Sequence, residues 1–120
     1  MKIREALALA DAQRINGIDE VLKLQWLSEL DGRVVREVIS PFAEGDFKGY
    51  SADTARDTAL LIPYPYDSIY PAYLVMNIDR LNNEMQKYND GADACAEIME
   101  AYRSWYVRTH RATTPKMKFF

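Results

Sequence analysis

The side chains that most often carry chemistry are scarce in this sequence. His110 is the single histidine and Cys95 the single cysteine, and neither has a second ligand at a metal-binding spacing. Cys95 falls on the apolar stripe of a predicted helix, which favours a buried structural thiol. The sequence contains no glycine-rich phosphate loop, G-x-S-x-G turn or CxxC pair. We therefore predict no catalytic, metal-binding or cofactor-binding residues, and a protein that is not an enzyme.

Tyrosine is the more informative residue type. Eight of the 120 residues are tyrosine, and Tyr64, Tyr66, Tyr70 and Tyr73 lie close together. An aromatic stripe on a helix is typical of a core. Tyrosine is also enriched in protein interfaces, because its ring can be buried while its hydroxyl stays in water. The pattern is compatible with internal packing and with a contact surface.

Three polar residues interrupt the apolar face predicted for the helix that contains Tyr73. They are Asn77, Arg80 and Glu84, of which the last two are four residues apart and can form an ion pair. Polar groups at such positions need partners. Two interpretations remain open, an internal polar network and a polar seam between subunits.

Helices are predicted to position these residues. Apolar periodicity indicates helices over 3–12 and 20–39, a third that begins after residue 68, and a fourth that ends near residue 109. Asn16-Gly17 ends the first helix and Asp19 caps the second, which we expect to continue through Asp31-Gly32. The third and fourth are predicted to form an antiparallel hairpin that turns at 88–91. The expected fold is all-α, a small bundle of about four helices in one domain over residues 1–110.

The two helices of the hairpin each present an apolar face. The predicted faces are Ile69, Tyr70, Tyr73, Leu74, Leu81, Met85 and Tyr88 on the third helix, and Cys95, Ile98, Met99, Tyr102, Trp105 and Tyr106 on the fourth. Ser68 is the expected N-cap of the third helix, with Pro71 in its first turn.

Two segments lack this periodicity. The loop at about 40–58 contains Phe42, Phe47 and Tyr50, and the tail at 111–120 contains Lys116, Lys118, Phe119 and Phe120. The loop either folds its aromatic rings back onto the core or orders against a neighbouring molecule. The tail, basic and apolar at its end, is expected to be flexible and could dock on another subunit.

Composition limits the classes of function. Acidic residues exceed basic ones and give a net charge of −3, which disfavours a protein that grips nucleic acid through its overall field. No apolar run approaches the roughly 20 residues that cross a bilayer. A single cysteine and no recognisable signal peptide indicate synthesis in the cytoplasm.

Several motifs resemble those of a family of small phage and prophage proteins of Gram-positive bacteria. The motifs are Trp26–Arg33, Asp57–Asp67, Tyr70-x-x-Tyr73-Leu74, Ile78-Asp79, Glu84-x-x-x-Tyr88-Asn89 and Trp105-Tyr106-x-Arg108-Thr109-His110. They span nearly the whole chain apart from the 40–58 loop and the last residues. One departure is Gly91–Cys95, where the family has a more aromatic, asparagine-containing stretch. This family is similar to the head–tail connector, or adaptor, proteins of long-tailed phages.

The resemblance implies a virion protein, made in the bacterial host cytoplasm, that assembles as a ring beneath the portal and joins the DNA-filled head to the tail. Its implied partners are other copies of itself, the portal protein and the next connector or tail-completion protein, with DNA incidental and no membrane. We expect Tyr73, Asn77, Arg80 and Glu84 to form one contact patch. The 40–58 loop and the Lys116–Phe120 tail are expected to reach the portal or a neighbour.

Two alternatives come from other classes. The first is a small DNA-associated packaging module that uses the basic residues Arg103, Arg108, Arg111, Lys116 and Lys118. The second is a host-directed regulatory protein that binds one cellular partner through its tyrosine-rich face.

Overall fold

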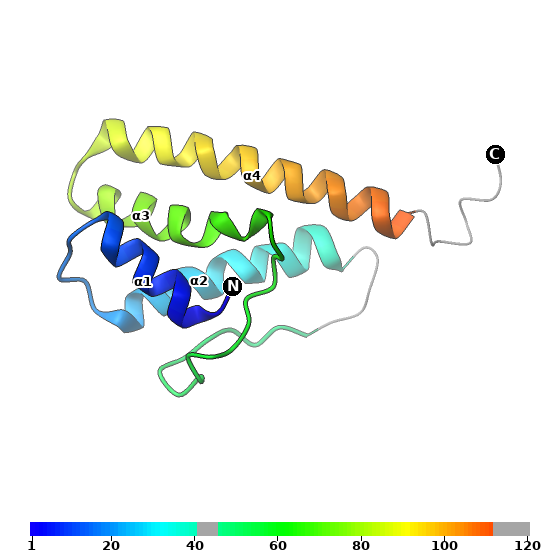
Figure 1. Cartoon of the computed structure of the whole chain (residues 1–120), viewed down its shortest axis with the longest axis horizontal. Helices are drawn as coiled ribbons and strands as arrows, with labels where there is room; N and C mark the ends of the chain where they lie inside the picture. Colours follow the sequence, from blue (N-terminus) through cyan, green and yellow to red (C-terminus); the bar gives the residue numbers. More distant parts are fainter. Residues whose placement is uncertain (41–45, 112–120) are drawn as a thin grey trace.

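Helices account for most of the chain (Figure 1). The computed structural model describes residues 1–40 and 46–111, with side chains through His110. The helices are α1 (Ile3–Gln13), α2 (Glu20–Val34), α3 (Ile69–Leu81) and α4 (Met85–Arg111), with a π-helical turn η1 (Val35–Ile39) and a 3-10 turn η2 (Tyr66–Ser68). Within this described part, the β-type pairing is one isolated antiparallel bridge between Lys2 and Ala59. The prediction of an all-α bundle is confirmed.

The first helix packs on α3 through a face of small and medium apolar residues. The predicted positions Ile3, Ala6, Leu7 and Ala10 are all buried. Their spacing of i, i+3, i+4 and i+7 places them on one side of the helix. The start of α1 is held by the segment near residue 58, because the Ile3 amide donates to the Thr58 carbonyl at 3.0 Å and the Leu60 amide donates to that of Met1 at 2.9 Å.

The second helix begins and continues as predicted. The Asp19 carboxylate accepts a 2.9 Å hydrogen bond from the Val21 amide and so satisfies a donor that the first turn leaves free. The helix runs through Gly32 and changes to π-helical geometry only in its last turn, Val35–Ile39. It is buried on more than one side, at Leu24, Trp26, Leu27, Leu30 and Val34.

The hairpin of α3 and α4 exists, but its predicted turn at 88–91 is wrong. The chain reverses at Asn82–Glu84, where Asn83 adopts a left-handed φ of 58° that asparagine tolerates better than most residues. The Glu84 amide donates to the Asp79 carbonyl at 2.9 Å, and the Glu84 carbonyl accepts the Tyr88 amide at 2.9 Å and so starts α4. The helix-ending signal at Asn89-Asp90-Gly91 therefore lies inside α4.

Gly91 serves close packing rather than a turn. A Cβ at this position would lie 3.3 Å from the Cβ of Met76 on α3. The glycine thus lets two helices approach closely, a need that the local sequence pattern does not distinguish from a helix end. With the turn moved, Leu81 and Met85 lie at its edges and are 45% and 54% exposed, so the predicted apolar face of the third helix is wrong at these two positions.

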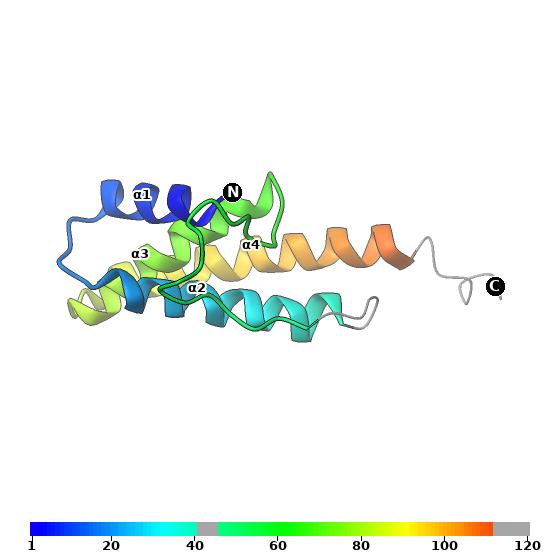
Figure 2. The same cartoon turned by 90° about the horizontal axis from the view of Figure 1, so that it is seen from below.

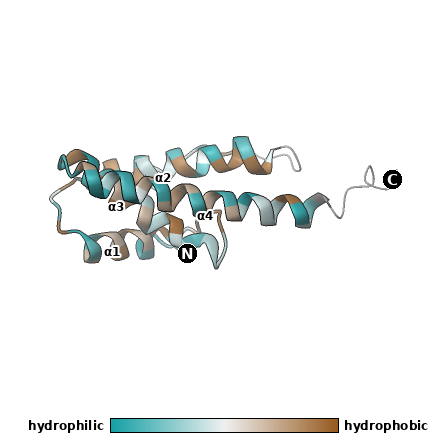
Figure 3. Ribbon diagram, turned by 90° about the horizontal axis from the view of Figure 1, so that it is seen from above, coloured by the Kyte–Doolittle hydropathy of each residue, from teal (hydrophilic) through white to brown (hydrophobic). Residues whose placement is uncertain are grey.

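The bundle has α3 in its middle. Figure 1 shows α3 running opposite to both α2 and α4, and Figure 2 shows α1 and α2 lying apart from each other in the view from below. α4 has 27 residues and α3 has 13, or about 40 Å and 20 Å at 1.5 Å per residue. The second half of α4 therefore extends past α3 and contacts η2 and η1. Figure 3 shows polar and apolar residues alternating along its exposed length.

Candidate interaction surface

A buried carboxylate joins the segment 46–62 to two helices. Asp31 on α2 is fully buried, and its Oδ2 accepts hydrogen bonds from the Tyr50 hydroxyl at 2.5 Å and the Leu61 amide at 3.2 Å. Its Oδ1 accepts one from the Tyr70 hydroxyl at 2.6 Å. The Tyr70 hydroxyl in turn accepts the Ile62 amide at 2.7 Å. The segment is thus fixed to α2 and α3 through one side chain.

Burial dominates the electrostatics of this cluster. Loss of water raises the pKa of Asp31 above its ordinary value, although the hydrogen bonds from Tyr50, Tyr70 and Leu61 act in the opposite direction. Burial and the neighbouring Asp31 charge also raise the pKa of both tyrosines. The hydroxyls of Tyr50 and Tyr70 and both oxygens of Asp31, which lies at 0% exposure, are used within the cluster, so it anchors the segment 46–62.

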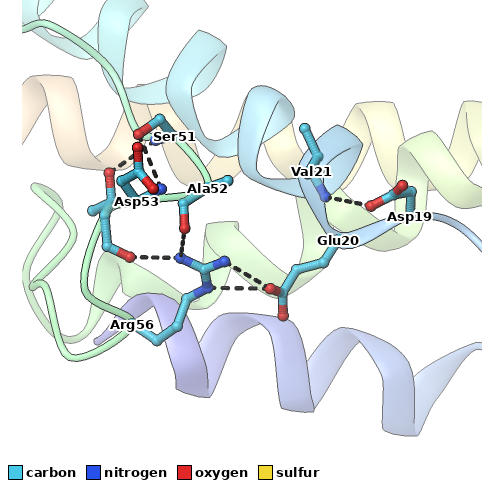
Figure 4. Close-up of polar contacts among 8 residues, drawn as sticks. Asp19, Glu20, Val21, Ser51, Ala52, Asp53 and Arg56 are labelled. Carbon is cyan, nitrogen blue, oxygen red and sulfur yellow. Dashed lines mark hydrogen bonds and ion pairs between the residues drawn. The ribbon is translucent and has the colours of Figure 1, made fainter.

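The same segment is tied to the start of α2 by Arg56 (Figure 4). Its guanidinium donates to Glu20 Oε2 through Nη2 at 2.8 Å and Nε at 3.2 Å. It also donates to the backbone carbonyls of Ala52 and Thr54, which closes the turn at 51–56. Ser28 on α2 completes the attachment, since its hydroxyl accepts the Tyr50 amide at 2.6 Å and donates to the Tyr50 carbonyl at 3.1 Å. The described part of the predicted loop is therefore packed against the bundle.

An open groove of about 340 Å³ lies among α2, α3 and α4. It is lined by the buried Leu30, Ile69 and Cys95, the partly exposed Tyr73, Met76, Tyr88 and Met99, the small Ala92 and Ala96, and the charged Arg33 and Glu100. Alanine at positions 92 and 96 leaves the space between α4 and α2 unfilled. Burial raises the pKa of Cys95 to about 11, so its thiol is a poor nucleophile near neutral pH.

One acidic and one basic side chain line the groove, Glu100 and Arg33. Burial, and to a lesser extent the charge of Glu29, raise the pKa of Tyr73 in the groove, whereas Arg33 acts in the opposite direction. Arg33 lies 3.2 Å from Glu37, and Arg103 lies 3.6 Å from the same carboxylate. Glu37 thus partly neutralises both arginines, while Glu100 forms no ion pair with any described residue.

Aromatic side chains cover the part of α4 beyond α3. Tyr66 of η2 packs on Tyr102 and Trp105 with ring centroids 5.9 Å apart in both pairs. One turn further, Tyr106 and His110 stack at 3.7 Å with nearly parallel rings. Trp105 is only partly buried. This end of α4 therefore carries an aromatic cluster with a partly accessible indole, and Tyr102, Trp105 and Tyr106 belong to the stripe predicted for the fourth helix.

Three of the four residues predicted as a contact patch, Tyr73, Asn77 and Arg80, are joined by hydrogen bonds along α3. Asn77 is buried, and its amide donates to the Tyr73 carbonyl at 2.9 Å while its Oδ1 accepts Arg80 Nη2 at 3.2 Å. The Asn77–Arg80 contact agrees with the internal-network interpretation. The predicted Arg80–Glu84 pair is wrong, because α3 ends at Leu81 and Glu84 belongs to the turn. Tyr73 lines the groove, whereas Arg80 and Glu84 are exposed.

The other predicted residues divide into two groups. In the loop, Tyr50 binds Asp31, and Phe47 packs edge-on against Tyr50 with centroids 5.1 Å apart, so the rings fold back onto the bundle. The remaining predictions lie outside the described residues, namely Phe42, Lys116, Lys118, Phe119 and Phe120.

Sequence reasoning missed two buried carboxylates and the groove. Asp31 was visible only as part of a possible helix break. Asp79 is 2% exposed and accepts a 2.9 Å hydrogen bond from Arg14 Nε, a contact across 65 positions that no local pattern indicates. The usable signal was that both aspartates fall among apolar residues of long helices, where a charge requires partners.

The described residues contain no group of three or more His, Cys, Asp or Glu side chains that could hold a metal ion. In the same residues, none of the helices combines the length and apolar character that a membrane crossing requires. No protein-family model, curated protein or solved structure matches this chain.

Proposed function

We propose that this chain is a non-enzymatic assembly subunit of a tailed phage, a head–tail connector that forms a ring under the portal. The observation that carries the proposal is the presence of two unlike surfaces at different places on one small bundle. One is the apolar groove around Tyr73 and Met99, and the other is the aromatic end of α4 around Trp105. A ring requires two unlike patches per subunit, because each copy contacts its two neighbours with different faces.

The anchoring of the 46–62 segment supports the same proposal. Asp31, Ser28 and Arg56 commit its polar groups to contacts within the chain. The described part of the loop, 46–62, is therefore committed to the bundle rather than to the groove or the α4 end. A pre-organised surface lowers the entropy cost of association.

The two alternatives receive less support. Arg103, part of the basic strip that a DNA-packaging module would use, lies 3.6 Å from Glu37, which reduces its attraction for phosphate. A host-directed regulator would need one partner-binding face, whereas this bundle offers two.

Electron microscopy tests the proposal by comparing purified portal rings of a candidate tailed phage with and without the full chain. A connector adds a second ring of density to one end of the portal. A portal particle unchanged at saturating chain concentration contradicts the connector function. Retention of the chain on duplex DNA at about 50 mM salt, lost at about 200 mM, would instead support the packaging module.

A further inference from the structure

The apolar groove has a candidate occupant within the same sequence. Residues 112–120 lie outside the described part of the structure, and they contain Lys116, Met117 and Lys118 followed by Phe119 and Phe120. Two aromatic residues and a methionine match a groove lined by Tyr73, Met76 and Met99. Glu100 lines the groove and forms no ion pair with any described residue, whereas the segment carries two lysines and no acidic residue.

Chain length decides which copy can supply the segment. Ala96 in the middle of the groove lies 15 residues before Arg111 on α4, or about 22 Å along the helix. A segment that returns to its own groove must first reverse, and a turn uses about four residues. The five residues that remain before Phe120 span at most about 18 Å. The tail therefore falls short of the middle of its own groove, while a neighbouring copy has no such limit.

We propose that residues 116–120 of one copy dock in the α2–α3–α4 groove of a second copy. The contact is heterologous, because tail and groove are different surfaces, and it leaves each docked copy with a free groove or a free tail for the next one. This inference deepens the proposed function, on which it rests, by naming the surface that receives the tail. In this arrangement Glu100 is the acidic partner for a lysine of the tail, and Ala92 and Ala96 leave room beside α4 for the two phenylalanine rings.

Disulfide formation between two differently substituted full-length chains tests the docking. Both chains carry Cys95→Ser, which removes the native thiol. One chain also carries Met117→Cys, which leaves both phenylalanines and both lysines in place. The other carries Ala96→Cys in the groove or, as the matched control, Ala94→Cys. Ala94 is also an exposed alanine of α4, but it does not line the groove.

Docking raises the local concentration of the tail thiol at the groove, so the mixed dimer should form about tenfold faster with Ala96→Cys than with Ala94→Cys. Adding Phe119→Ser and Phe120→Ser to the tail chain should remove this preference. Circular dichroism of each variant verifies that the helices are intact. Equal rates at positions 94 and 96 overturn the inference, as does a preference that survives loss of both phenylalanines.

Ring formation by the unsubstituted chain with portal rings, compared with the disulfide rates, separates this inference from the proposed function. Rings on the portal without a preference for position 96 overturn tail docking and leave the connector function standing. A clear preference for position 96, together with no ring under any condition, upholds tail docking and overturns the connector function.

Discussion

The hydroxyl of Tyr70 on α3 lies 2.6 Å from Asp31 Oδ1 on α2 and accepts the Ile62 amide at 2.7 Å on its other side. Tyr70 and Asp31 are both fully buried. The Tyr70 hydroxyl thereby satisfies a buried carboxylate and a buried backbone donor. It joins α2 and α3 to the segment 46–62, which connects these helices in the sequence. This relationship ties together α2 and α3, two of the three helices that border the groove.

Replacing Tyr70 by Phe should destabilise the chain by about 1–3 kcal/mol, because it leaves a carboxylate oxygen and an amide buried without a partner. Urea unfolding followed by circular dichroism measures the change in the free energy of unfolding. Tyr64→Phe is the matched control, since Tyr64 is 85% exposed, and it should change stability by less than about 0.5 kcal/mol. Similar losses in the two variants would mean that the Tyr70 hydroxyl does not bridge Asp31 and Ile62.

Asp31 should make stability depend on pH in a defined direction. Its pKa is raised in the folded chain, so the folded state holds this proton more tightly than the unfolded state does. The resulting contribution is fully present below the unfolded pKa near about 4 and is lost as pH rises through the folded pKa.

The measurement is the unfolding free energy of the unsubstituted chain minus that of Asp31→Asn across this range. The subtraction cancels the other titrating groups. We expect the difference to fall as pH rises. A difference that grows with pH would show that the hydrogen bonds to Asp31 outweigh the cost of its burial.

Two helical glycines should respond differently to alanine. A Cβ on Gly32 would meet its nearest neighbour, Arg36 Nη1, at 3.8 Å, an ordinary contact. Gly32→Ala should therefore stabilise the chain by about 1 kcal/mol through helix propensity. A Cβ on Gly91 would lie 3.3 Å from Met76 Cβ, an atom held by the backbone of α3. Gly91→Ala should gain much less or lose stability, as thermal unfolding of both variants would reveal. Equal gains would mean that α3 and α4 separate at no cost.

Arg80→Ala should weaken assembly more than folding. Arg80 is exposed, and its one described hydrogen bond runs to Asn77 within α3. Its loss should cost the monomer less than about 1 kcal/mol, whereas a contact with a second copy would be lost entirely. Sedimentation velocity gives the assembled fraction, and urea unfolding gives the stability of the monomer.

The control is Arg4→Ala, since Arg4 pairs with Asp57 at a site where both side chains are at least 60% exposed. Proportional losses of assembly and stability in Arg80→Ala would remove Arg80 from the subunit contact.

Local periodicity was sufficient to predict the helices and most of the core. The buried faces of α1 and α4 follow from spacings of three and four residues, and the Asp19 cap follows from residue type alone. The turn between α3 and α4 could not be predicted in this way. Asn82-Asn83 and Asn89-Asp90-Gly91 offer similar local signals, and the close contact of Gly91 with Met76 decides between them.

The partners of the polar residues on α3 could not be predicted, for the same reason. Asn77 and Arg80 were identified as polar residues on an apolar face, but helical spacing could not say that Arg80 contacts Asn77 rather than Glu84. Asp31, Tyr50 and Tyr70 meet across 19 and 39 positions of sequence. Such a cluster depends on tertiary packing, so a single sequence gives only the weak signal of a carboxylate among apolar residues.

The absolute mass of the full chain in solution tests the central claim, assembly into a ring, most directly. Light scattering after size-exclusion chromatography should be recorded over a wide range of concentration, alone and with portal rings present. We predict a species of many 13.8 kDa subunits, or a mass that rises toward one with concentration or on addition of the portal. A mass that stays at 13.8 kDa under all these conditions would contradict the assembly function.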